Sequence, residues 1–175
     1  MQRIFLIGYM GAGKTTVGRD LSKILNLSFI DLDHYIEGRY MKTVDQFFKE
    51  FGEEKFRNTE RRMLEEISSF EDVIISTGGG SPCFFDNMQL MKEAGTTVYL
   101  KVSADELAKR LEIARTVRPV LAGRKGDALK AFIKESLEKR EPYYSQANIV
   151  FDAENMLTEQ DAHEISEQLA QLLKN

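Results

Sequence analysis

The sequence predicts an α/β protein with a parallel sheet between two layers of helices. Five short runs rich in apolar and β-branched residues recur along the chain, and segments with helical periodicity lie between them. Four of the five runs lack a clean alternation of apolar and polar residues, which is typical of strands buried on both faces. Strands that alternate with helices form parallel sheets through right-handed crossovers, so we predict a three-layer α/β/α architecture.

The elements are expected in alternating order along the whole chain. The predicted strands are residues 3–7, 27–31, 73–76, 97–102 and 148–151. The predicted helices are residues 15–25, 44–51, 53–68, 86–94, 104–111, 128–139 and 159–173. Pro142 follows the sixth of these helices and is expected to end it, while Thr158 and Asp161 have the spacing of a capping box that opens the last one.

Length and composition indicate one soluble domain over residues 1–175. Apolar residues make up 42% of the chain and charged residues 30%, and no apolar run is long enough to span a bilayer. No signal peptide is recognisable, so we expect a cytoplasmic protein without a membrane partner. We also expect a monomer. The net charge of −4 gives no indication of nucleic-acid binding. The single cysteine, Cys83, is interpreted as a small apolar filler.

A phosphate-binding loop directly follows the first predicted strand. The segment Gly8-Tyr9-Met10-Gly11-Ala12-Gly13-Lys14-Thr15 fits the P-loop spacing Gly-x4-Gly-Lys-[Ser/Thr] at every required position. Its glycines let the backbone curl so that several N–H groups point at one phosphate chain. The helix that follows directs its N-terminus at the same phosphates, Lys14 reaches the β and γ oxygens, and Thr15 reaches a magnesium ion. The loop is therefore interpreted as a cradle for ATP or GTP.

Two aspartates follow the second predicted strand. Asp31 and Asp33 are one residue apart, so at an extended strand end they would point the same way. Carboxylates facing a nucleotide site can hold a magnesium ion through its waters and bind a substrate hydroxyl. In the alternative interpretation, Asp33 is only the N-cap of a short helix over residues 34–37.

Three consecutive glycines follow the third predicted strand. Gly78, Gly79 and Gly80 give up much backbone entropy on folding, and turns rarely need three glycines. A close approach of the backbone to a ligand explains them better, with a flexible turn as the alternative. The carboxyl ends of parallel strands meet at one edge of the sheet, so this turn, the phosphate loop and the aspartates are expected to share one site.

Several arginines are candidates for anion binding. Arg57 lies three residues before Glu60 on a predicted helix, and the pair is either a surface salt bridge or a carboxylate clamp oriented by Glu60. Residues 110–126 form a basic, irregular segment, which is either a solvated charge run or a mobile lid over the phosphates. Arg140 either faces the site or complements the C-terminus of its helix.

In this order and spacing, these motifs resemble the shikimate kinase family. The resemblance runs through the phosphate loop and Thr16-Val17-Gly18, Asp31-Leu32-Asp33, Gly52-Glu53, Phe56 to Glu60, Thr77 to Gly80, Arg118-Pro119-Val120-Leu121, and Arg140 before Pro142-Tyr143. It implies a P-loop kinase of the nucleoside-monophosphate-kinase type with the strand order 2-3-1-4-5. It also implies transfer of the γ-phosphate of ATP, with Mg²⁺, to the 3-hydroxyl of shikimate in aromatic amino-acid biosynthesis.

The resemblance also assigns roles to individual residues. Residues that match Arg57 and Arg140 hold the shikimate carboxylate, the match of Asp33 meets its hydroxyls, and the matches of Gly78, Gly79 and Gly80 line its pocket. Asp31 matches a residue associated with magnesium. Arg118 matches the arginine that approaches the transferred phosphate, and Arg110 matches one that stacks on adenine. The implied nucleotide-binding residues are Gly11, Ala12, Gly13, Lys14, Thr15, Thr16, Arg110 and Arg118, the implied metal ligands are Thr15 and Asp31, and the implied catalytic residues are Lys14, Asp33 and Arg118.

Two other functions remain open from the residues alone. A related P-loop kinase would phosphorylate gluconate or a nucleoside monophosphate instead of shikimate. A regulatory nucleotide-binding domain would lack Asp33 or the basic segment, and both are present in this chain.

Overall fold

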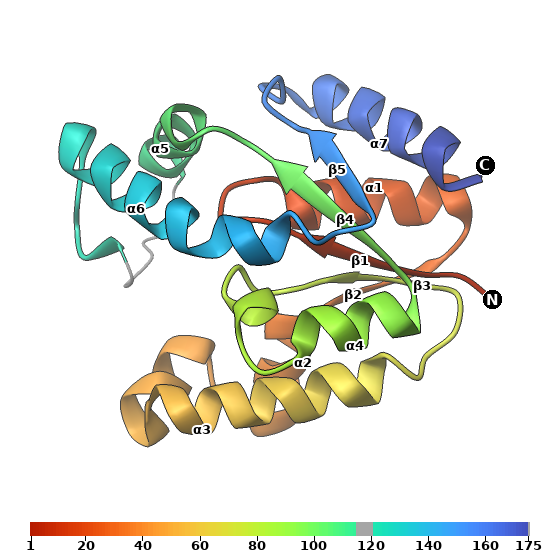
Figure 1. Ribbon diagram of the computed structural model, residues 1–175, viewed down its shortest axis with the longest axis horizontal. Coiled ribbons are helices and arrows are strands. Elements are labelled where there is room, and N and C mark those ends of the chain that lie inside the picture. The colour runs from red at the N-terminus through yellow and green to blue at the C-terminus, as the bar shows by residue number, and fades with distance from the viewer. Residues whose placement is uncertain (115–120, 175) are drawn as a thin grey trace.

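The fold is a five-stranded parallel sheet with the strand order β2-β3-β1-β4-β5 (Figure 1). The computed structural model describes residues 1–114 and 121–174. The strands are β1 (Arg3–Ile7), β2 (Ser28–Asp31), β3 (Val73–Ser76), β4 (Thr96–Lys101) and β5 (Ile149–Asp152). Each lies within one residue of its predicted bounds, and the predicted order is confirmed.

Neighbouring residues of the central strand belong to two different cores. Ile4 and Leu6 pack with Val17 and Leu21 of helix α1 (Lys14–Leu25). The alternate residues of β1, which include Phe5, pack on the opposite face of the sheet. Because successive side chains of a strand point to opposite faces, an uninterrupted apolar strand provides both cores at once. The continuous apolar run that predicted a buried strand is thereby explained.

Helices cover both faces of the sheet, as predicted. Helix α7 (Glu159–Lys174) packs beside α1 on one face, while α3 (Val44–Ile67) and α4 (Asn87–Ala94) cover the other (Figure 1). Helix α2 (Leu32–Tyr40) follows β2 directly and packs on α3. The short 3₁₀ helix η1 (Ser81–Cys83) follows the three glycines, and α5 (Ala104–Ile113) packs against α6 (Gly126–Tyr144).

Two helices differ from their predicted extents. Helix α6 continues through Pro142 to Tyr144, so the expectation that this proline ends it is wrong. A proline inside a helix costs free energy because it cannot donate a backbone hydrogen bond. Tyr144, two residues further on, is fully buried, and the free energy gained by burying its side chain offsets this cost. The two helices predicted over residues 44–51 and 53–68 form one element, α3, which is broken at Gly52, where φ is 82° and ψ is 170°.

The predicted helix ends have clear local causes. A capping box between Thr43 and Gln46 opens α3. The predicted box before α7 is confirmed, since the Asp161 backbone N–H donates to the Thr158 hydroxyl and the Thr158 N–H donates to the Asp161 carboxylate. In the part of the chain that the structure describes, no helix is long and apolar enough to cross a membrane.

Candidate active site

The phosphate loop has the backbone shape that its glycines predicted. Gly8, Gly11 and Gly13 have φ values of 147°, 84° and 95°, a region that side chains with a Cβ rarely adopt. Gly13 is the N-cap of α1, so the helix begins at Lys14 with its N-terminal N–H groups at the loop. The ammonium of Lys14 donates to the carbonyls of Gly8 at 2.8 Å and Tyr9 at 2.9 Å. This arrangement places a lysine and helix N–H groups around one concave backbone.

Thr15 and Asp31 meet at the entrance of this loop. The Thr15 hydroxyl donates to Oδ2 of Asp31 at 3.0 Å, while Oδ1 of Asp31 accepts from the backbone N–H of His34. Asp31 is therefore both the last residue of β2 and the N-cap of α2. The sequence placed Asp31 and Asp33 on one extended strand end, with Asp33 as the alternative cap, and both expectations are wrong.

Asp33 lies in the first turn of α2 and faces the glycine turn. A Cβ added at Gly78 would lie 3.1 Å from Oδ1 of Asp33. Burial, and then the nearby Asp31 carboxylate, raise the pKa of Asp33, although Lys14 opposes the shift. A carboxylate whose pKa is raised accepts a proton more readily than an exposed one does.

Each of the three glycines of this turn packs against a charged side chain. A Cβ added at Gly79 would lie 3.1 Å from Nη1 of Arg140, and one at Gly80 would lie 2.6 Å from Nη2 of Arg57. None of the three has a positive φ, so a left-handed backbone is not what requires glycine at these positions. The requirement is space for the backbone to approach Asp33, Arg140 and Arg57.

Arg57 and Glu60 form a buried ion pair on α3. Nη1 of Arg57 lies 3.0 Å from Oε1 of Glu60, and the two side chains are 13% and 1% exposed, so the alternative of a surface salt bridge is wrong. The guanidinium also lies 4.1 Å from the ring centroid of Phe84. Burial raises the pKa of Glu60 to about 7 although Arg57 opposes this shift.

Arg140 reaches the same turn from α6. Its guanidinium carbon lies 5.1 Å from the ring centroid of Tyr9 in the phosphate loop. The Tyr144 hydroxyl, one turn further along α6, donates to the carbonyl of Gly79. The last turn of α6 holds no basic residue, so the interpretation of Arg140 as a helix C-terminal charge is wrong.

Among the described residues, four buried polar atoms at this turn have no hydrogen-bond partner: Nη1 of Arg140, Nε of Arg57, Oε2 of Glu60 and Oγ of Ser81. Buried polar groups are nearly always paired, so atoms of this kind beside the turn are available to pair with a polar ligand or with water. Two guanidinium groups beside an aspartate can bind a small anion that carries hydroxyls. The glycine turn and the phosphate loop thus lie side by side, with the charged groups of the turn next to the loop.

Arg110 lies beside the phosphate loop. Its guanidinium donates to the carbonyls of Gly11, Ala153 and Glu154, and it thereby joins α5 to the phosphate loop and to the segment after β5. Within the predicted lid over residues 110–126, the first four residues belong to α5 and the last begins α6. Arg118 and the rest of residues 115–120 lie outside the described residues.

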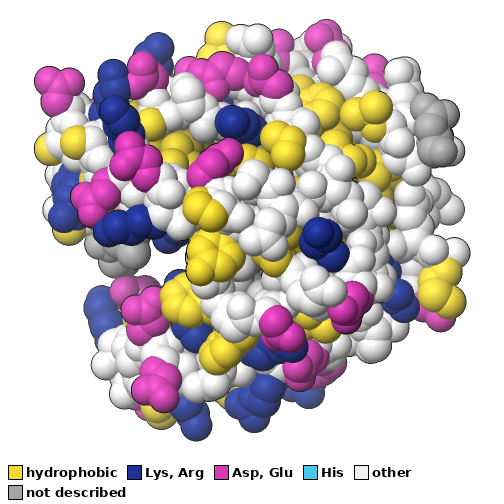
Figure 2. All heavy atoms as spheres, in the orientation of Figure 1, with side chains coloured by type: hydrophobic (Ala, Val, Ile, Leu, Met, Phe, Trp, Pro, Cys, Tyr) yellow, Lys and Arg dark blue, Asp and Glu magenta, His cyan; other side chains and the backbone are white. Residues whose placement is uncertain are grey.

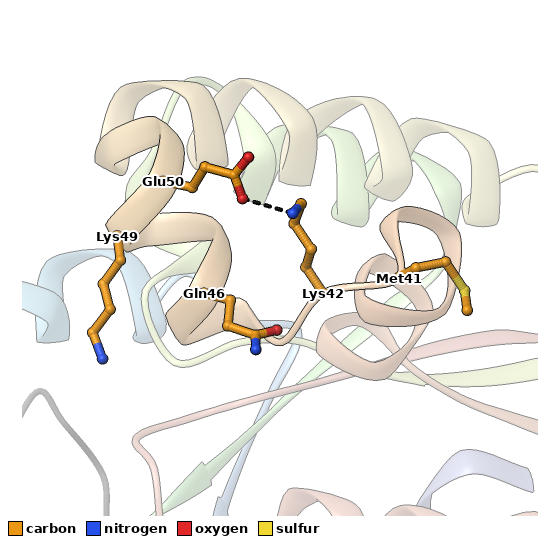
Figure 3. Close-up of a pocket in the computed structure, with 5 residues that line it drawn as sticks. All are labelled: Met41, Lys42, Gln46, Lys49 and Glu50. Atoms are coloured by element: carbon orange, nitrogen blue, oxygen red, sulfur yellow. Dashed lines mark ion pairs between the residues drawn. The ribbon is translucent and has the colours of Figure 1, made fainter.

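The surface is hollowed between the part that contains α5 and α6 and the part that contains α2 and α3 (Figure 2). A separate open depression of about 460 Å³ lies at the junction of α2 and α3 (Figure 3). Its charged side chains already form ion pairs, Lys42 with Glu50 at 2.6 Å and Lys49 with Asp45 at 2.7 Å. None of the predicted site residues lines it, so we assign no function to it.

Three aromatic residues around this turn were not predicted from the sequence. Tyr9 and Phe84 lie against the two arginines, and Tyr144 holds the glycine turn. Their positions in the sequence carry only one signal, since Tyr9 and Phe84 are each close to a glycine-rich turn. A ring that supports a distant arginine cannot be distinguished by sequence from a ring that packs in the core.

Comparisons with known proteins agree with one another over nearly the whole chain. The family model described as Shikimate kinase matches residues 10–170. A shikimate kinase from Parabacteroides distasonis is 66% identical over 173 residues, which cover 99% of this chain and 100% of that protein. The crystal structure of shikimate kinase from Bacteroides thetaiotaomicron superposes with a TM-score of 0.96 at 50% identity and covers 99% of both chains. A shikimate kinase from Acinetobacter baumannii, solved in complex with shikimate, has a TM-score of 0.88 at 30% identity over 99% of this chain and 93% of that one.

Proposed function

The chain belongs to the shikimate kinase family, and on this basis we propose which of its residues bind ATP and which bind shikimate. The protein phosphorylates shikimate, with ATP as the co-substrate. In our proposal the phosphate loop binds ATP, while the side chains around the glycine turn bind shikimate and present its 3-hydroxyl. The observation that carries this division is the turn itself, because its three glycines bring Asp33, Arg140 and Arg57 to one short stretch of backbone beside the loop.

On the nucleotide side, the loop N–H groups and Lys14 bind the β and γ phosphates of ATP. Gly11, Ala12, Gly13 and Thr16 contribute through the loop and the first turn of α1. Thr15 and Asp31 are suited to Mg²⁺, because their oxygens lie 3.0 Å apart beside the loop. Mg²⁺ is commonly held by one or two protein oxygens together with phosphates and water. When bound, it would neutralise charge on the phosphate oxygens.

On the acceptor side, Arg57 and Arg140 bind the shikimate carboxylate and Asp33 binds the hydroxyl that reacts. A guanidinium can donate two parallel hydrogen bonds to a carboxylate, which fixes its orientation as well as its position. Glu60 and Phe84 hold Arg57 for this contact. The unpartnered Nη1 of Arg140 supports the same assignment.

In the reaction, the hydroxyl oxygen of shikimate bonds to the γ-phosphorus as the bond to the bridging oxygen of ADP breaks. Lys14 stabilises the charge that develops on the phosphate oxygens, and Asp33 orients the hydroxyl and accepts its proton. Positioning and charge neutralisation supply most of the acceleration. We further propose that Arg118 approaches the transferred phosphate, that Arg110 stacks on adenine, and that residues 110–126 close over ATP.

A coupled assay of ADP release tests the choice of acceptor. We expect turnover with shikimate and none above background with gluconate or AMP at equal concentrations. ADP released without any acceptor is the control for simple ATP hydrolysis. Turnover with another acceptor but not with shikimate would overturn the proposal.

The phosphate role of Lys14 is tested by replacing it with methionine. Lys14→Met keeps a long side chain but removes the charge, so we expect turnover to fall by a factor on the order of a thousand or more. An unchanged thermal unfolding midpoint would show that the variant still folds. Substantial residual activity in the folded variant would contradict this role.

A further inference from the structure

Tyr9 connects the two halves of the site. Its backbone carbonyl accepts a hydrogen bond from the ammonium of Lys14 at 2.9 Å, on the nucleotide side. Its ring lies beneath the guanidinium of Arg140, on the acceptor side, at 5.1 Å from the ring centroid to the guanidinium carbon. Only 1% of Tyr9 is exposed, so the ring is fixed by packing around the loop.

Arg140 and Arg57 are held in different ways. Arg57 pairs with the carboxylate of Glu60 at 3.0 Å. Among the described residues, Arg140 has no carboxylate partner. Its surroundings include the Tyr9 ring, the Tyr144 hydroxyl and the backbone of Gly79, where an added Cβ would lie 3.1 Å from its Nη1. Its orientation therefore depends on neutral groups: the aromatic face of Tyr9, the Tyr144 hydroxyl and the close approach of Gly79.

An aromatic face and a carboxylate orient a guanidinium with different consequences. A carboxylate partner neutralises the guanidinium and competes with a substrate carboxylate for its N–H donors. A ring attracts the cation through its face and leaves the N–H groups at the edge of the guanidinium available. A guanidinium that is already oriented also loses less side-chain freedom when a ligand binds.

We propose that Tyr9 is a positioning residue, whose ring holds Arg140 in the orientation that binds the acceptor carboxylate. The proposal rests on the proposed function of Arg140 and adds to it. The phosphate loop then contributes to both sites. The carbonyl of Tyr9 binds Lys14, and the ring of Tyr9 supports Arg140, which binds shikimate in the proposed function. The ring face carries out this role, since the Tyr9 hydroxyl has no hydrogen-bond partner among the described residues.

Two substitutions of Tyr9 separate the ring from its hydroxyl. Tyr9→Leu removes the aromatic face, and we expect the KM for shikimate to rise on the order of fivefold, while kcat and the KM for ATP change by less than about twofold. Tyr9→Phe keeps the face, and its KM for shikimate should stay within about twofold of the wild type. An equal rise in both variants, or no rise in Tyr9→Leu, would overturn the proposal.

A double-mutant cycle with Arg140→Lys tests whether Tyr9 acts through Arg140. We expect Arg140→Lys to raise the KM for shikimate by itself, and Tyr9→Leu to add less than about twofold to that rise. A full additional fivefold rise would show that Tyr9 acts elsewhere and would overturn the inference alone. No effect of Arg140→Lys would instead contradict the proposed function.

Folding controls keep this experiment decisive. Each variant is compared with the wild type by thermal unfolding before its kinetics are measured. If Tyr9→Leu does not fold, Tyr9→Met supplies a longer apolar side chain without a ring, and the same rise in KM is expected. A fall in kcat and a rise in the KM for ATP of similar size would indicate a general distortion of the loop and would also overturn the proposal.

Discussion

The geometry around Arg57 makes the shape of its side chain as important as its charge. The guanidinium lies between Glu60, the Phe84 ring and the backbone of Gly80, and a planar group fits this narrow space. A lysine ammonium is compact, is more strongly hydrated and cannot donate two parallel hydrogen bonds. We therefore expect the proposed site to require an arginine at this position and not merely a cation.

Replacing Arg57 with lysine tests this dependence. We expect Arg57→Lys to raise the KM for shikimate on the order of tenfold or more, because the positive charge remains but the pair of parallel N–H donors is lost. The KM for ATP is the internal control and should change little. Steady-state kinetics with each substrate varied in turn measure both values, and an unchanged KM for shikimate would count against the clamp.

Glu60 makes the stability of the protein depend on pH. Burial raises the pKa of Glu60 from 4.5 to about 7 in the folded protein, against the opposing effect of Arg57. Between these values the folded protein holds a proton that the unfolded chain has released. This contribution to stability is fully present below pH 4.5 and is lost as the pH rises through about 7.

The variant Glu60→Gln removes this titration. We expect the wild type to lose stability relative to Glu60→Gln as the pH rises from about 4.5 to 7, by on the order of 3 kcal/mol at most. Urea unfolding of both proteins across this range measures the difference, in which the titration of other groups cancels. A difference that is constant with pH would show that Glu60 does not titrate in this range.

At the scale of the element, the break in α3 sets the direction of the helix that carries Arg57 and Glu60. Gly52 has φ and ψ values of 82° and 170°, which are accessible essentially to glycine alone. Its neighbours on either side are helical, so the break divides α3 into a first part that begins at Val44 and a second part that carries Arg57 and Glu60. The two separate helices predicted from sequence thus reflect a real boundary, although the chain continues without a loop.

A pair of glycine substitutions tests the backbone at this break. Gly52→Ala should destabilise the protein by about 1–3 kcal/mol, because alanine is strained in this conformation. Gly38 is the matched control, since it lies inside α2 with nothing within 4 Å of an added Cβ. Gly38→Ala should stabilise by about 0.5–1 kcal/mol. Urea unfolding measures the change in stability of both variants. An increase in stability for Gly52→Ala would contradict the expected backbone strain at this position.

At the scale of the whole molecule, the proposed acceptor site is assembled from elements on both sides of the central strand. Asp33 comes from α2, Arg57 from α3 and Arg140 from α6, and all three meet at the turn after β3. A ligand that contacts all of them ties these elements together. Unfolding must release such a ligand, so binding stabilises the entire fold.

Stabilisation by shikimate tests this assembly without any turnover. At a concentration about 100 times its Kd, shikimate should raise the free energy of unfolding by about 2.7 kcal/mol. Arg140→Lys should need a higher concentration for the same rise, and gluconate should have no such effect. Chemical unfolding at several ligand concentrations measures this, and an equal effect of gluconate would contradict a site specific for shikimate.

We also expect the protein in solution to have the mass of one chain, 20.0 kDa.

Local sequence features determined much of this protein. The phosphate loop was predictable because its residues are consecutive and its glycines require φ values that few other residues adopt. The strands were predictable because an uninterrupted apolar run of only a few residues is enough to indicate a buried strand. The order of the strands, in contrast, was implied only by the family resemblance, since no run of residues specifies which distant strand will lie beside it.

The tertiary structure decided the questions that depend on distant residues. Whether Arg57 and Glu60 are exposed or buried depends on what covers their helix, and the structure covers it with the glycine turn and Phe84. Asp33 lies on a helix and not on a strand end, because Asp31 caps that helix. Pro142 stays within α6, because Tyr144 beyond it is buried. Local preferences act over a few residues, whereas burial and the contact of Arg140 with Tyr9 arise only when the packed elements bring remote parts of the chain together.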